Sequence, residues 1–173
     1  MAERPYHREN LAAAIAQQAR MQLETNGAEQ LSLRQIARFL DVTPAAVYRH
    51  YPDKASLLAQ LRETITDELT ATLREGVLDS ADATIMLTRM VANLLAYATQ
   101  HPQAIVFVLT KPLEVPQSLQ TVVTLYTAQH PAARAPQNPA QACWLFLLGI
   151  LLVHDSDLTA EWITTQLKYL LGD

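Results

Sequence analysis

The chain has 173 residues, half of them hydrophobic and 17% charged, so it holds ample apolar material for a packed core. Only four glycines and no long alternating β-branched runs argue against a strand-rich fold with many tight turns, and the sequence predicts an all-α protein. The formal charge of −4 divides unevenly, because residues 1–60 carry seven Lys/Arg against six Asp/Glu and residues 61–173 carry six against eleven. A neutral to slightly basic N-terminal part is compatible with local binding to nucleic acid.

The first predicted helix covers residues 10–25. Gly27 follows at the position where a helix stop is expected. Apolar side chains recur in this segment at every fourth position, as an amphipathic helix requires: Leu11, Ile15, Ala19 and Leu23.

A short second helix follows and ends near Leu40. Ser32 with Gln35 three positions later forms a capping-box pattern at its start. Asp41 then occupies the turn, where aspartate tolerates the left-handed conformation better than most residues other than glycine.

The third helix is predicted to begin after Thr43, whose hydroxyl can cap it, with Pro44 at the first helical position, where no amide donor is needed. Pro52 closes this helix and Asp53 can cap the next. Two short helices joined by a three-residue turn predict a helix-turn-helix. The alternative is an ordinary helical hairpin inside a bundle.

A fourth helix continues to about residue 74 and leads into a second region, in which the Pro-rich segment 131–139 is a loop. Further helices are predicted at about 82–100, 103–111, 116–130, 139–154 and 159–171. We expect a cytoplasmic protein without a membrane span, because the N-terminus has no apolar signal segment and the longest apolar run, 143–153, is short of the roughly 20 residues a span requires. Cys143 is the only cysteine, which excludes an internal disulfide and a cysteine-based zinc site.

The stretch LSLRQIARFLDVTPAAVYRHYPDKASLL, within residues 8–62, resembles the helix-turn-helix of tetracycline-repressor (TetR-type) bacterial regulators. Asp41 departs from the family pattern, which usually has glycine in the turn. The resemblance implies a three-helix DNA-binding domain over residues 1–60, followed by a helical effector-binding and dimerisation domain over 61–173. The residues that carry it are Ile36, Ala37, Val42, Val47, Tyr48, His50, Tyr51, Lys54, Leu57 and Leu58.

The resemblance further implies a ligand-responsive regulator, expected to be a repressor, whose dimer binds a quasi-palindromic operator in double-stranded DNA. It implies that Thr43, Pro44 and Ala45 face the major groove and that Tyr48 reaches the DNA backbone or a base edge. Arg49 then faces a base or a phosphate, and Ser32 uses its hydroxyl for capping, for a phosphate or for both. Arg34 either contacts DNA or is an ordinary surface arginine. The two expected phosphate contacts are His50 and Lys54.

The second region contains the run CWLFLLGILLV, which is apolar on all sides and therefore needs burial on all sides. We expect this helix and the last one to form a four-helix interface with a second copy, the alternative being a core helix of a monomer. The predicted interface residues are Leu147, Leu148, Leu151, Trp162, Ile163, Leu167 and Leu170.

A small apolar or amphipathic effector is expected to release the DNA. The side chains that could line its cavity are Met86, Met90, Tyr97, Phe107, Cys143 and Trp144, although such residues are more often plain core.

Two other functions compete with this one. His154, Asp155 and Asp157 could form a metal or acid–base site, but they are explained more simply as the junction between two helices, and we expect neither an enzyme nor a cofactor. The alternative to a DNA-binding regulator is a protein-interaction module whose helix-turn-helix packs on protein.

Overall fold

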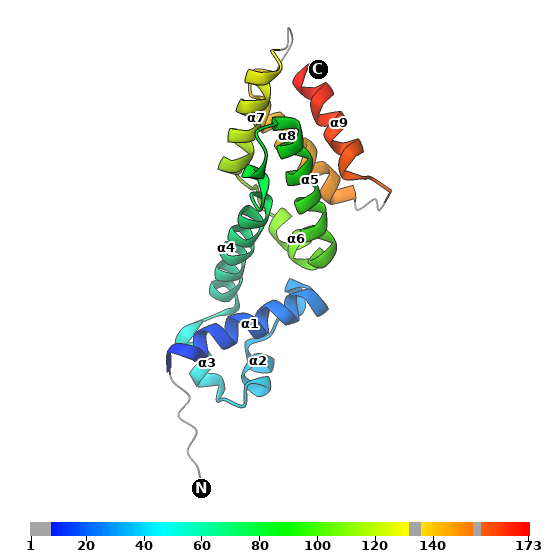
Figure 1. Ribbon diagram of the computed structural model, residues 1–173. Coiled ribbons are helices and arrows are strands. Elements are labelled where there is room, and N and C mark those ends of the chain that lie inside the picture. Colours follow the sequence, from blue (N-terminus) through cyan, green and yellow to red (C-terminus); the bar gives the residue numbers. More distant parts are fainter. Residues whose placement is uncertain (1–7, 132–135, 154–156) are drawn as a thin grey trace. The chain divides into compact units, whose positions relative to one another are not determined.

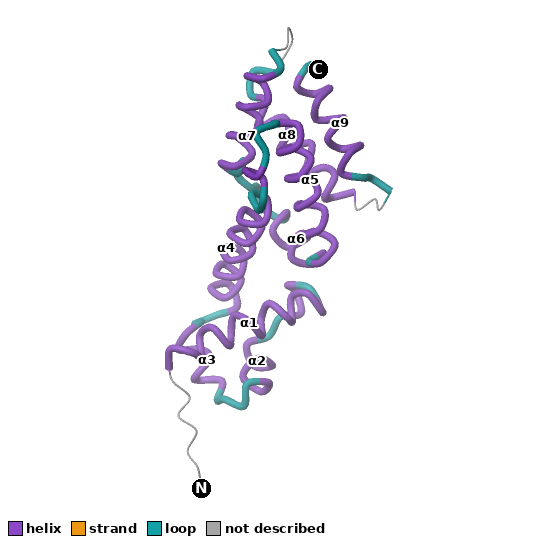
Figure 2. The backbone as a smooth tube through the Cα atoms, in the orientation of Figure 1, coloured by secondary structure: helices purple, strands orange, loops and turns teal. Residues whose placement is uncertain are grey.

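The computed structural model describes residues 8–131, 136–153 and 157–173, and within these ranges all regular secondary structure is helical, as predicted (Figures 1 and 2). The α-helices are α1 (Arg8–Asn26), α2 (Leu33–Phe39), α3 (Pro44–His50), α4 (Lys54–Leu73), α5 (Ala83–Gln100), α6 (Pro102–Leu109), α7 (Gln117–Gln129), α8 (Pro139–Val153) and α9 (Ala160–Leu171). Two 3₁₀ turns, η1 (Ala28–Gln30) and η2 (Val77–Asp79), were not predicted.

Helix starts follow local capping chemistry. The Asp53 carboxylate accepts the Ser56 amide at 2.7 Å before α4, and the Ser56 hydroxyl accepts the Asp53 amide in return at 3.4 Å. The Asp82 carboxylate accepts the amides of Thr84 and Ile85 at the start of α5, and these bonds lower its pKa. Side chains within three residues therefore determine where these helices begin.

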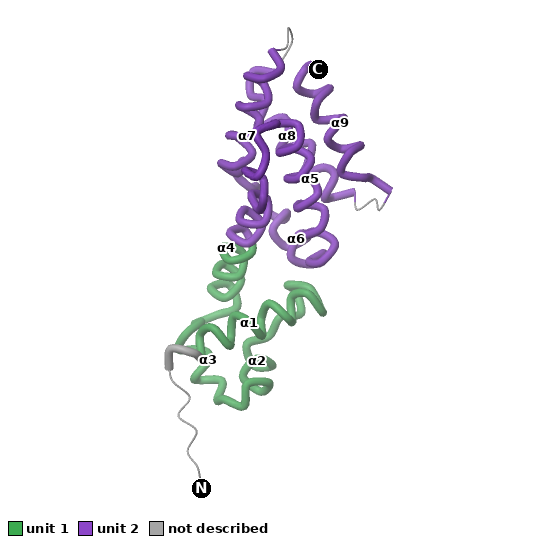
Figure 3. Tube along the Cα trace, in the orientation of Figure 1, with its two compact units in different colours: residues 1–65 green, residues 66–173 purple. Residues whose placement is uncertain are grey.

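The chain divides into two compact units, residues 1–65 and 66–173 (Figure 3). The boundary falls inside α4, so the first half of this helix belongs to unit 1 and the second half to unit 2. That unit 1 binds DNA, and that unit 2 binds an effector and dimerises, stays a prediction.

Unit 1 consists of α1, α2, α3 and the beginning of α4, together with the turn η1. Its apolar centre includes Ile15, Leu23, Ile36, Val47 and Leu57, each fully buried. Because α2 and α3 are only seven residues long, this shared core holds them together rather than their own helical propensity.

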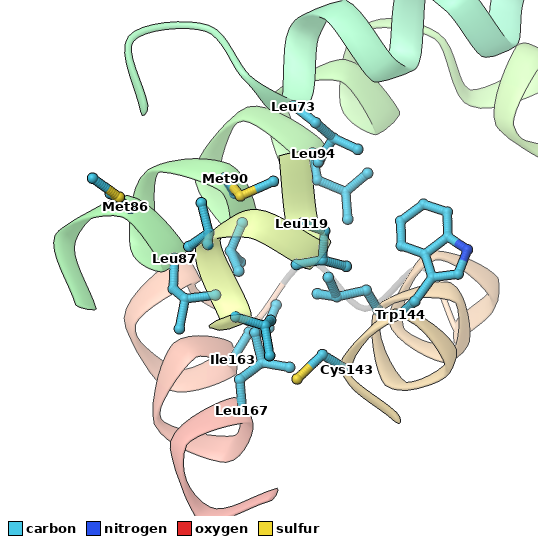
Figure 4. Close-up of a cluster of buried hydrophobic side chains, with 14 of the residues drawn as sticks. Leu73, Met86, Leu87, Met90, Leu94, Leu119, Cys143, Trp144, Ile163 and Leu167 are labelled. Carbon is cyan, nitrogen blue, oxygen red and sulfur yellow. The ribbon is translucent and has the colours of Figure 1, made fainter. Parts of the chain in front are cut away.

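In unit 2, α5 packs against α7 and α9, and α8 packs against α7 and α9. Buried side chains of these helices form one cluster, with Leu87 and Leu94 of α5 facing Leu119, Ile163 and other residues (Figure 4). None of the described helices combines the length with the apolar character that crossing a bilayer requires.

Candidate DNA-binding surface

Helix α2 is fixed to α1 at its first turn. The Ser32 hydroxyl accepts the Gln35 amide at 3.4 Å, which is the predicted cap. A capping box would also have the Gln35 side chain accept the Ser32 amide. The structure differs here, because the Ser32 amide donates instead to the side chain of Gln22 on α1 at 3.4 Å. The half-buried Ser32 therefore ties two helices together as well as capping one.

The turn between α2 and α3 is a Schellman motif. The Val42 amide donates to the Ala37 carbonyl at 3.0 Å, and the Asp41 amide donates to the Arg38 carbonyl at 3.3 Å. Asp41 has φ +54°, the left-handed conformation predicted for it, and it is the one non-glycine residue with positive φ among the described parts of the chain. Its short side chain lets the turn form without glycine.

Asp41→Gly is expected to raise the free energy of unfolding of unit 1, by up to about 1 kcal/mol, because glycine adopts this φ without strain. Asp41→Ala is expected to lower it by a similar amount, since alanine adopts the left-handed region less readily than aspartate. Urea titrations of the two variants against the parent chain measure both changes. If alanine proves as stable as glycine, the turn is not strained at this residue.

Helix α3 has two distinct faces. Thr43 caps it by accepting the Ala46 amide at 3.3 Å, and Pro44 occupies the first position, as predicted. Ala46 and Val47 turn inward and are buried. The remaining predicted DNA contacts of this segment are exposed: Thr43, Pro44, Ala45, Tyr48, Arg49 and His50.

Lys54 begins α4 and is half-buried. Its ammonium group donates to the backbone carbonyl of Glu29 in η1 at 2.6 Å. An ammonium has three donors, so this bond positions the side chain while leaving donors for a phosphate oxygen. Tyr51 lies just before it, and burial raises the pKa of its phenol, which therefore remains protonated well above neutral pH.

Two exposed residues of α2 are absent from the predicted contacts. Arg38 lies four positions after Arg34, and both are exposed, so they share one face of the helix. The spacing of the two arginines could have revealed this pair. Phe39 is 67% exposed beside the turn, and nothing within unit 1 explains its exposure.

The six predicted effector residues lie in the apolar interior of unit 2. Met86, Met90, Cys143 and Trp144, labelled in Figure 4, belong to the core cluster together with Tyr97, and Phe107 is buried on α6. Burial raises the pKa of the Cys143 thiol to about 11. The Trp144 indole donates to the Leu113 carbonyl at 3.2 Å. These side chains are buried as core residues are, and their role as an effector site stays a prediction.

The predicted interface residues divide into two groups. Leu147, Leu151, Ile163 and Leu167 are 0–3% exposed within a single chain, so they stabilise the core of unit 2 and present no surface to a second copy. Leu148 is half-buried, and Trp162 and Leu170 are exposed. Other exposed apolar side chains of the same two helices, which the prediction omitted, are Leu145, Leu152, Val153 and Tyr169.

Of the candidate metal or acid–base group, His154 and Asp155 lie outside the described residues, and Asp157 is exposed. Among the residues that the structure describes, no cluster of three or more His, Cys, Asp or Glu could hold a metal ion.

Residues 15–61 match the sequence profile of the bacterial regulatory proteins of the tetR family. Over 103 residues the chain is 30% identical to the nucleoid occlusion factor SlmA of Escherichia coli K12, covering 59% of this chain and 52% of that protein. The chain thus spans about half the length of the curated relatives it matches.

Solved structures share the fold over nearly the whole chain. A protein of unknown function from Rhodococcus sp. RHA1 superposes with a TM-score of 0.75 at 25% identity, covering 98% of this chain and 97% of its own. A bacterial regulatory protein in the tetR family, also from Rhodococcus RHA1, gives 0.66 at 16% identity, covering 93% and 96%. A TetR family transcriptional regulator from Thermus thermophilus gives 0.60 at 20% identity, covering 91% and 96%.

Proposed function

Since this chain belongs to the tetR family of bacterial regulatory proteins, we propose that it is a ligand-responsive DNA-binding transcriptional regulator that acts as a dimeric repressor. The observation that carries the proposal is the division of α3 into an inner face that closes unit 1 and an outer face left to solvent. A short helix held in this way, with its first turn exposed, is the geometry with which a helix-turn-helix enters the major groove.

The exposed residues of α3 have distinct roles in this proposal. Arg49 carries the five donors of a guanidinium and can contact a guanine edge bidentately. Tyr48 reaches a base edge or the backbone, and the small side chains of Pro44 and Ala45 let the helix approach the groove closely. His50 and Ser32 contact phosphates at the edges of this surface.

Lys54 and the α2 arginines supply the electrostatic part of binding. Lys54 stands at the first position of α4, where the helix dipole also favours an anion. Arg34 and Arg38 extend the basic surface along α2. Such contacts bring counterion release and therefore a steep dependence of affinity on salt.

The experiment that tests DNA binding is a selection of bound duplexes from random DNA, followed by affinity measurements from about 50 to 200 mM salt. We expect Lys54→Ala to weaken binding to all sequences alike and to lower the slope of log affinity against log salt by about one unit. Lys111→Ala, an exposed lysine in unit 2, is the matched control and should change neither quantity.

An unchanged slope in Lys54→Ala would remove this residue from the interface. If the parent chain selects no duplex at all and its helix-turn-helix instead retains a protein, the alternative function as a protein-interaction module is favoured.

Dimerisation is proposed through the outward faces of α8 and α9. Leu145, Leu152 and Trp162 are exposed apolar side chains on these two helices, and a soluble chain rarely leaves such a set uncovered. A twofold axis through this surface would present two copies of α3 to two half-sites, which makes the operator quasi-palindromic.

Release from DNA is proposed to follow the binding of a small effector to unit 2. The effector acts by binding the DNA-free conformation more tightly than the DNA-bound one, since a ligand shifts an equilibrium only by its differential affinity.

A further inference from the structure

The turn between α1 and α2 begins with a backbone conformation that glycine adopts and other residues avoid. Helix α1 ends at Asn26, and the Gly27 amide still donates to the Leu23 carbonyl at 2.8 Å. Gly27 has φ +77° and ψ +166°, a region of backbone space that is essentially closed to residues with a Cβ. At this residue the chain leaves α1 and enters the 3₁₀ turn η1.

Two further bonds hold η1 in place. The Leu31 amide donates to the Ala28 carbonyl at 3.4 Å and closes the turn, and the Leu31 side chain is buried. The Ser32 amide then donates to the Gln22 side chain of α1. The turn η1 is therefore fixed at both ends.

The carbonyl of Glu29 lies in the middle of this fixed turn and accepts a proton from the Lys54 ammonium group at 2.6 Å. Lys54 begins α4, 25 positions later in the chain, so this bond joins η1 to the start of α4 within unit 1. Hydrogen bonds with a charged donor are stronger than bonds between neutral groups. The bond therefore restricts the end of a long and flexible side chain.

The restricted position of Lys54 bears directly on a phosphate contact. An ammonium group has three donors around one nitrogen, so the proton directed at Glu29 leaves two that point away from η1. Ordering a long side chain at an interface lowers affinity, and a side chain that is ordered before binding avoids this loss. The ordered ammonium group belongs to the first residue of α4, where the helix dipole also favours an anion.

We propose that Gly27 and the turn η1 are a positioning element for DNA binding, which acts through the Glu29 carbonyl on the ammonium group of Lys54. Gly27 makes no contact with DNA in this arrangement, and its effect on affinity passes through Lys54. This role rests on the phosphate contact proposed for Lys54 above, and it makes the strength of that contact depend on a residue outside the helix-turn-helix.

The first test needs no DNA. In a chain labelled with ¹⁵N at its lysines, we expect the Lys54 ammonium group to be less mobile and to exchange its protons more slowly than that of Lys111, an exposed lysine of unit 2. Gly27→Ala should make Lys54 behave like Lys111, because alanine strains the turn and displaces the Glu29 carbonyl. Equal behaviour of the two lysines in the parent chain would overturn the positioning role.

The second test is a double-mutant cycle on the selected operator. Gly27→Ala alone is expected to reduce affinity roughly three- to tenfold for each half-site, as loss of one pre-ordered side chain predicts. It retains the charge of Lys54, so the slope of log affinity against log salt should equal that of the parent chain. In the Lys54→Ala background the same substitution should change affinity by less than about twofold.

Ile15→Val is the matched control for loss of stability. Ile15 is fully buried on α1, so this variant loosens the core of unit 1 without altering η1 and should leave operator affinity unchanged. Circular dichroism and urea titration verify that each variant is folded under the conditions of the binding measurement.

The outcomes distinguish failure of the positioning role from failure of the phosphate contact. If Lys54→Ala binds the operator as the parent does, with the same salt slope, both are overturned. If Lys54→Ala weakens binding but Gly27→Ala leaves affinity unchanged, or weakens it equally in both backgrounds, only the positioning role is overturned. If Gly27→Ala does not fold, the comparison of Lys54 with Lys111 in the parent chain decides.

Discussion

Replacing Tyr48 and Arg49 together with alanine is expected to lower affinity for the selected operator by about a hundredfold while the chain keeps its fold. Each base contact of this kind contributes about 1–3 kcal/mol of discrimination, and both side chains lie on the exposed face of α3. The loss should fall mainly on specific sequences, so the ratio of specific to non-specific affinity decreases. Fluorescence anisotropy with operator and scrambled duplexes measures it.

Arg74→Ala is the matched control, because it removes an exposed arginine from unit 2 and should leave operator affinity unchanged. Circular dichroism of the double variant verifies that the helices remain. Retention of the parent's affinity in the double variant would mean that α3 does not read the operator.

Leu152→Glu is expected to convert a folded dimer into a folded monomer and to raise the dissociation constant of the dimer about a hundredfold or more, because a carboxylate would be buried without a partner. Leu152 is 66% exposed on α8, so the substitution costs the single chain little. Leu125→Glu makes the same chemical change on an exposed position of α7 and should leave the dimer intact. Light scattering and sedimentation at micromolar concentration distinguish the two variants.

Leu167→Glu separates assembly from folding. Leu167 is fully buried on α9, so this variant should lose the fold of unit 2 rather than its dimerisation alone. If Leu152→Glu remains dimeric, the interface lies elsewhere than on the outer face of α8.

Gly149 supports this location of the interface. It lies on α8 between Leu145 and Leu152, and a methyl group added there would meet no atom within 4 Å apart from its neighbouring residues and the adjacent backbone of its own helix. A glycine inside a helix lowers helix stability by about 1 kcal/mol relative to alanine. Packing within the chain does not explain why a glycine occupies this position. Close approach of a second helix would account for it.

The sequence predicted helix boundaries well because their determinants are local. Ser32, Thr43 and Asp53 each accept an amide three positions ahead, and prolines open α3, α6 and α8. The exposed face of α3 could also be predicted from local sequence. Two buried positions in a seven-residue helix determine which side of the helix faces solvent.

The orientation of α8 could not be predicted in this way. A helix that is apolar on every side has no preferred face, so nothing in the run distinguishes the buried Leu147 and Leu151 from the exposed Leu145 and Leu152. α9 is different, since Ile163, Leu167 and Leu171 recur every fourth residue and mark the buried side. Two of these three residues, Ile163 and Leu167, are in the predicted interface because that prediction counts the whole helix as apolar surface.

Contacts between segments distant in the sequence were also beyond prediction. The bond from Ser32 to Gln22 and the bonds from Asn93 to the end of α4 join residues 10 to 21 positions apart. For each of these groups, local sequence patterns predict a hydrogen-bond partner only a few residues away.

Cys143 provides the chain with an internal reporter of core opening. It is the only cysteine, it is fully buried, and its thiol remains protonated at neutral pH because burial raises its pKa to about 11. A thiol in this state reacts with an alkylating reagent only when the surrounding core transiently opens, so the labelling rate measures the free energy of that opening. Because Cys143 reacts so slowly, a cysteine introduced at an exposed position can be labelled selectively with a single fluorophore.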